Sequence, residues 1–263
     1  MDKKQLFLCR QWFEDYAASF HCLDVEVEKN MDLKLQHTSR VFENIKRIAG
    51  TLDMQEEDMA LAEAIALFHD VGRFEQMRVY GTFNDRISAD HSKIGLRVLN
   101  RSGVLSILPA NERNLIRKCI WNHNKYQLQA SDKADFLLFS RLIRDADKLD
   151  ILGIILEHFD TREQHPNQAL DLGMVDESDL SPDVISDVVQ GRMVRIAGMR
   201  TLLDMRMMYL SWIFDIHFPF TLACIKEKGY LKRLMAGVPD DANSERAKDS
   251  LRAYLQKRCE MYI

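Results

Sequence analysis

Apolar residues recur along most of this chain at steps of three and four residues, which is the spacing of one buried helix face. Asn30 is expected to cap a helix, and Gly72 to stop one. Residues 73–90 follow neither the helical nor the strand period, so an ordered loop is expected there. In the first half, helices are predicted over residues 3–20, 31–49, 53 or 55–70, 92–101 and 109–123.

The second half continues the helical pattern after an acidic, aperiodic loop over residues 161–181. No strand is predicted. The chain is therefore expected to be a single all-α domain over residues 1–263, with a core over about 30–153 and a helical extension over about 181–263. Helices are predicted here over residues 134–156, from Pro182, and over 199–216, 219–228, 230–236 and 242–262.

Composition agrees with a helical globular protein. Only 11 glycines and 5 prolines occur among 263 residues. The formal charge is −4, with acidic and basic residues interspersed, which argues against nucleic acid and membrane surfaces as partners. Five scattered cysteines and an N-terminus without an apolar core predict reduced thiols, no signal peptide and a cytoplasmic location. The 13 methionines are expected to fill core gaps.

Polar residues occupy positions where apolar ones are expected, on or at the ends of several predicted helices. Imidazole nitrogen binds Fe, Mn, Co, Zn and Ni, and a carboxylate can bridge two cations. Six such ligands suit two divalent metal ions side by side, with Asp70 as the natural bridge. For the last carboxylate ligand, the candidate is Asp147, with Asp145 and Asp150 as alternatives. The six candidates are His37, His69, Asp70, His91, His123 and Asp147.

The spacing of these residues resembles the HD superfamily of metal-dependent phosphohydrolases over about residues 30–153. The family pattern of His, His-Asp and Asp falls on His37, His69-Asp70 and Asp147, which the resemblance makes metal ligands. Binuclear members have two further histidines, in the slots of His91 and His123. Several short motifs resemble those of an uncharacterised bacterial subgroup of this superfamily. They lie at residues 69–76, 80–83, 90–91, 123–125 and 144–150.

The resemblance implies hydrolysis of a phosphoester in a nucleotide or other small phosphorylated metabolite by a metal-activated water. Asp70 and Arg73 are expected to be catalytic. Two alternatives stay open: a mixed-valent di-iron oxygenase with the same ligands, and a nucleotide sensor without turnover. A homodimer is also compatible with the sequence.

Cationic residues and one aromatic residue lie beside the expected ligands. They are candidates for binding the substrate phosphate. The alternative is that the cations balance the charge of metal-bound carboxylates or lie in solvent, and that the aromatic ring packs its own loop. The candidates are Arg73, Lys125, Arg144, Lys148 and Tyr80.

Overall fold

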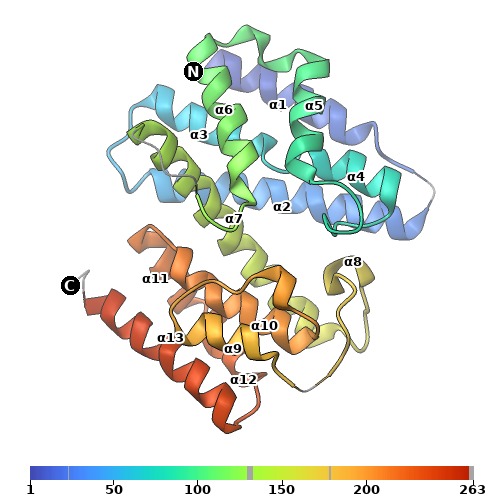
Figure 1. Cartoon of the computed structure of the whole chain (residues 1–263). Helices are drawn as coiled ribbons and strands as arrows, with labels where there is room; N and C mark the ends of the chain where they lie inside the picture. Colours follow the sequence, from blue (N-terminus) through green and yellow to red (C-terminus); the bar gives the residue numbers. More distant parts are fainter. Residues whose placement is uncertain (23, 129–132, 178, 261–263) are drawn as a thin grey trace. The chain divides into compact units, whose positions relative to one another are not determined.

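The computed structural model describes the chain except for residues 23, 129–132, 178 and 261–263. The described residues form helices and no strand, apart from an isolated bridge between Val175 and Thr201. The all-α prediction is confirmed (Figure 1). The backbone divides into two compact units, residues 1–150 and 151–263. The boundary falls inside one helix, three residues before the predicted end of the core.

In the first unit, α3 packs against α1, α2 and α6, while α4 packs against α2 and α5. Aromatic rings fill the space between them; the ring of Phe74 contacts those of Phe13, Tyr16 and Phe20. The elements are α1 (Lys3–Ala18), α2 (Val25–Ala49), α3 (Glu56–Phe68), α4 (Gly72–Tyr80), α5 (His91–Ser102), η1 (Val104–Ile107), α6 (Ala110–His123) and, as far as Asp150, α7 (Ala134–Thr161).

Helix α2 begins earlier than its apolar pattern predicts. The carboxylate of Asp24 accepts hydrogen bonds from the backbone N–H groups of Glu26 and Val27, so it caps the helix. Asn30 lies inside the helix and donates to the carbonyl of Glu26. The prediction that Asn30 is the cap is therefore wrong, because a better capping carboxylate stands six residues upstream.

Gly72 begins a helix instead of ending one. A Cβ at this position would collide with the backbone carbonyl of His91 and the backbone nitrogen of Gly95. The glycine therefore allows α4 to start in direct contact with α5. The predicted loop over residues 73–90 is wrong for its first half, because α4 continues to Tyr80 and ends at Gly81, where φ is 63°.

The second unit is organised around α10, of which every residue except Arg206 is buried. Helices α9 and α12 pack against α10, and α13 packs against α9. Met205, Met207 and Met208 lie in this core, as expected for these three methionines. The elements after α7 are α8 (Gln168–Asp171), α9 (Pro182–Val189), η2 (Ile196–Gly198), α10 (Leu202–Ser211), η3 (Trp212–Asp215), α11 (Pro219–Glu227), α12 (Tyr230–Ala236) and α13 (Ala242–Glu260). The predicted end of the last helix, residues 261–262, lies outside the described residues.

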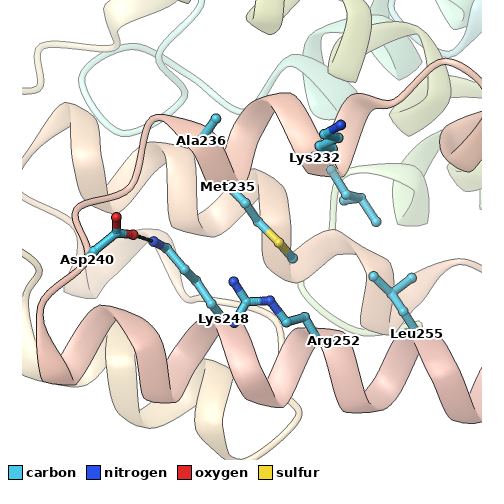
Figure 2. A pocket seen from close by; sticks show the side chains of 8 residues that line it. Lys232, Met235, Ala236, Asp240, Lys248, Arg252 and Leu255 are labelled. Atoms are coloured by element: carbon cyan, nitrogen blue, oxygen red, sulfur yellow. Dashed lines mark hydrogen bonds and ion pairs between the residues drawn. The ribbon is translucent and has the colours of Figure 1, made fainter.

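A shallow groove lies between α12 and α13 in this unit (Figure 2). Two of its cations are paired: Lys248 Nζ lies 2.6 Å from Asp240 and 2.9 Å from Glu245, and Arg252 lies 2.7 Å from Asp249. Its described lining residues include no histidine. The candidate chemistry therefore lies in the first unit. Across the described part of the chain, none of the helices combines the length and apolarity needed to cross a membrane.

Candidate metal centre

The six predicted ligands converge in the first unit, and five helices supply them. His37 lies in α2, His69 and Asp70 directly follow α3, and Asp147 lies in α7. The remaining two are the first residue of α5, His91, and the last residue of α6, His123. All four imidazoles and Asp70 are buried. Helix packing thus brings together residues that stand more than a hundred positions apart, such as His37 and Asp147.

Asp70 stands between two groups of imidazoles. Its Oδ2 lies 3.5 Å from His37 Nε2 and 3.6 Å from His69 Nε2. Its Oδ1 lies 3.3 Å from His91 Nε2 and 3.6 Å from His123 Nε2. We call the first group, with Asp147, the His37 side, and the second group the His91 side. Each side receives one oxygen of the same carboxylate, which is the arrangement of a bridging ligand.

On the His37 side, the Nε2 atoms of His37 and His69 lie 3.2 Å apart. Asp147 Oδ1 lies 3.2 Å from the first and 3.7 Å from the second. This oxygen is buried, and no described residue gives it a hydrogen bond with acceptable geometry. A buried carboxylate oxygen without a partner is costly, so it calls for a cation.

On the His91 side, the Nε2 atoms of His91 and His123 lie 3.0 Å apart. Two nitrogens bound to one cation at about 2.1 Å, with an angle of about 90–100° between them, lie about 3.0–3.2 Å from each other. Both imidazole pairs have this separation. Nitrogen and carboxylate oxygen donors are also the set that first-row divalent metals prefer. The residues present therefore fit divalent metal ions.

The outer nitrogen of each imidazole has an acceptor. His37 Nδ1 lies 2.7 Å from Asp150 Oδ2, and His91 Nδ1 lies 2.7 Å from Asp85 Oδ2. His69 and His123 direct Nδ1 to the carbonyls of residues 66 and 120, at 2.7 and 2.6 Å. Each acceptor keeps the proton on Nδ1. The Nε2 lone pairs are thereby left facing the centre, as metal ligation requires.

The electrostatics of the two sides differ. Burial and Lys34 lower the pKa of His37, but its contacts with Asp147, Asp150 and Asp70 outweigh them and raise that pKa to about 9. Burial and Arg73 lower the pKa of His91 to about 4, against the opposing effect of the nearby carboxylates. Without a cation, the carboxylates of the His37 side thus draw a proton onto the imidazole, which is the demand for positive charge that a metal ion would meet.

The three acidic candidates of α7 occupy different places. Asp147 faces the Nε2 atoms of the His37 side. Asp150, one turn later, accepts from His37 Nδ1 and, at 2.6 Å, from Arg40 Nε. Asp145 is buried in the same helix. The geometry favours Asp147 as the ligand and Asp150 as the residue that orients His37.

Arg73 lies between the centre and the loop over residues 81–90. Its Nη1 donates to the carbonyl of Phe83 at 2.6 Å and to Asp85 Oδ1 at 3.0 Å. Its buried Nε lies 3.5 Å from Asp70 Oδ1 and has no hydrogen-bond partner in the described part of the chain. Arg73 therefore adds a positive charge on the His91 side of Asp70 and has one donor still directed at the centre.

The other predicted phosphate-binding residues differ in their burial and in their partners. Lys125 Nζ contacts Asp90 Oδ2 at 2.6 Å. Arg144 is buried, and its Nη1 donates to the carbonyls of residues 122, 123 and 125, which fixes the end of α6. Lys148 is buried beside Asp147 in α7, and Tyr80 is 48% exposed at the end of α4. Their roles toward a substrate stay predictions.

Two residues of the site have no place in the sequence-based set. Asp85 contacts both His91 and Arg73, and it also accepts a hydrogen bond from Gln76 Nε2 at 2.8 Å. It lies in an aperiodic loop, where spacing carries no signal. Lys34 Nζ lies 2.7 Å from Asp70 Oδ2. Its position three residues before His37, on the same helix face, could have indicated it.

Comparison with known families agrees with this geometry. Residues 35–152 match the family model of the HD domain, a helical fold that binds divalent metals and occurs in a superfamily of metal-dependent phosphohydrolases. The matched segment contains all six predicted ligands. The predicted resemblance to the HD superfamily is confirmed at this level, and the subgroup stays a prediction. No curated protein and no solved structure matches the chain.

Proposed function

We propose that the first unit is a phosphohydrolase that uses two divalent metal ions and acts on a nucleotide or another small phosphorylated metabolite. The main support for this proposal is the position of the Asp70 carboxylate. Its Oδ2 faces one pair of imidazoles, and its Oδ1 faces the other pair. The HD-domain match over residues 35–152 supports the reaction class.

In this proposal, His37, His69 and Asp147 would hold one metal ion, His91 and His123 would hold the other, and Asp70 would contribute to both. The bound ions would supply an activated water and neutralise charge on the phosphoryl oxygens. The protein contributes the burial of the five inner ligands, which excludes bulk water and strengthens charge interactions. The proposed hydrolysis requires no side chain as a covalent nucleophile.

Arg73 would bind the anionic substrate. Its guanidinium is held by the Phe83 carbonyl and Asp85, while its Nε points to the carboxylate at the middle of the centre. A planar guanidinium that is fixed before the substrate arrives loses little side-chain entropy when it binds phosphate. Lys125 lies farther out, over the ring of Trp121 and beside Asp90, where it can attract an anion.

The test is a metal and activity measurement on the whole chain. Protein purified without oxygen is analysed for metal, loaded with Mn²⁺ or Co²⁺, and given nucleoside monophosphates, sugar phosphates and p-nitrophenyl phosphate. We expect anaerobic phosphate release and two metal equivalents per chain. His69→Ala should lose both metal and turnover, whereas His165→Ala, which removes an exposed imidazole, should keep them.

Two results would overturn the proposal. One is His69→Ala protein that still releases phosphate at the wild-type rate. The other is iron-dependent, oxygen-consuming turnover with no phosphate release, which would assign the centre to the oxygenase class instead. Tight binding of an unchanged nucleotide would point to a sensor.

A further inference from the structure

Lys34 places a positive charge beside Asp70, and it lies in the same helix as His37. It lies in α2, one turn before His37, and its side chain is only 13% exposed. Its Nζ lies 2.7 Å from Asp70 Oδ2, on the His37 side. An ammonium in such a place is expensive unless it has a defined partner, so its position indicates a role.

Lys34 and Arg73 both lie close to the aromatic ring of Phe83. Lys34 Nζ lies 5.3 Å from the centroid of the Phe83 ring, and the Arg73 guanidinium carbon lies 5.8 Å from it. Phe83 is buried, which fixes the ring. The two cations therefore flank the same carboxylate: Lys34 lies at Oδ2 and Arg73 Nε lies at Oδ1.

Lys34 also keeps donor capacity beyond its ion pair with Asp70. An ammonium has three protons, and the ion pair with Asp70 takes one. Arg73 donates from Nη1 to Gln76, Phe83 and Asp85, and its Nε stays directed at Asp70 Oδ1. A carboxylate oxygen has two lone pairs, so Asp70 Oδ2 can keep its bond to Lys34 and still offer a lone pair to the His37 side.

We propose that Lys34 is a substrate-binding residue of this centre, which pairs with Arg73 across Asp70 to hold the phosphate group of the substrate. The inference rests on the proposed function and names a second cation for the same site. Because Lys34 is mostly desolvated, its hydrogen bond to a phosphate oxygen is charge-assisted and stronger than one in open water. Its long, flexible side chain can reach an oxygen that the fixed guanidinium of Arg73 does not.

The test measures the binding of inorganic phosphate to the Mn²⁺-loaded full-length protein by calorimetry. Lys34→Met removes the charge and keeps an apolar chain over Phe83, and Lys34→Arg restores the charge. Lys46→Met is the matched control, because Lys46 lies in the same helix, over the ring of Phe42 and beside Glu43. Manganese content and the far-ultraviolet circular dichroism of each variant are measured on the same samples.

We expect Lys34→Met to weaken phosphate binding by about tenfold to hundredfold while it keeps the wild-type manganese content. Lys34→Arg should recover most of the loss, and Lys46→Met should bind like wild type. Phosphate binding by Lys34→Met within about twofold of wild type would overturn the inference. So would a loss of manganese from Lys34→Met, since Lys34 would then act only by positioning Asp70.

The same samples separate this inference from the proposed function. If the wild-type protein binds phosphate through Lys34 but releases none from any phosphomonoester, the hydrolase proposal fails and the assignment of Lys34 as a phosphate ligand stands. If hydrolysis occurs with the same KM in wild type and Lys34→Met, the hydrolase proposal stands and the role of Lys34 fails.

Discussion

The two sides of Asp70 share one carboxylate but differ in what surrounds it. The His37 side adds a second carboxylate, Asp147, whose inward oxygen is buried and lacks a well-aligned hydrogen-bond partner among the described residues. The His91 side adds none: its imidazoles stand at the start of α5 and the end of α6. Each oxygen of Asp70 has one cation beside it, so Asp147 makes the main difference in charge.

The difference shows how one scaffold can hold two unequal cation sites. Long helices carry the ligands His37 and Asp147, and a further carboxylate, Asp150, orients His37. The His91 side depends instead on Asp85, a residue of the loop between α4 and α5. We therefore expect the His37 side to bind a divalent ion more tightly, because it offers more negative charge and more rigid support.

The largest effect should come from Asp70→Asn, which removes the charge that both sides share. We expect loss of both metal equivalents and a fall in phosphate release of about a thousandfold or more. Metal analysis and an anaerobic phosphate assay measure these outcomes. Asp249→Asn, at an exposed position of α13, is the matched control. Two tightly bound equivalents in Asp70→Asn would show that the two sides do not depend on this carboxylate.

A substitution confined to one side should remove only one of the two metal-binding steps. In a Mn²⁺ titration of metal-free protein, Asp147→Asn should remove the tighter binding step, since it neutralises the carboxylate found only on the His37 side. His91→Gln should remove the weaker step and leave the tighter one. If both variants lose the same step, the two sides form a single cation site and the comparison fails.

The outer carboxylates should matter less than the ligands they orient. Asp85→Asn should weaken metal binding on the His91 side by about 10–100-fold, and Asp150→Asn should do the same on the His37 side. Asp85→Asn should also raise KM for phosphoesters, because Asp85 holds Arg73 as well as His91. Equal KM values in the two variants would contradict the link between Asp85 and Arg73.

The smallest effect is expected from Arg40→Met. Arg40 Nε lies 2.6 Å from Asp150 Oδ1, but its side chain is 44% exposed, so solvent screens the pair. Metal affinity on the His37 side should fall by no more than about fivefold. A Mn²⁺ titration beside wild type and Asp150→Asn measures this. A loss as large as that of Asp150→Asn would mean that Arg40, not His37, sets the position of Asp150.

Most of the fold and the six inward residues could be predicted from sequence, because helical period is a local property. His37 stands out because it falls on the apolar stripe of its own helix, and His69-Asp70 because it ends one. The glycine after that pair could not be interpreted locally. Gly72 looks like a helix stop, and its role appears only when the backbone of α5 lies against it.

The sequence by itself determined that the chain is helical and which imidazoles and carboxylates lie on or at the ends of buried helix faces, since spacing along a helix fixes which side chains point inward. Only the tertiary structure decided that Asp70 gives one oxygen to each pair of imidazoles, and that Lys34 and Asp85 belong to the centre. These relations depend on distances between separate helices and a loop. No local pattern encodes them, because they arise only when the packed core fixes the helices against one another.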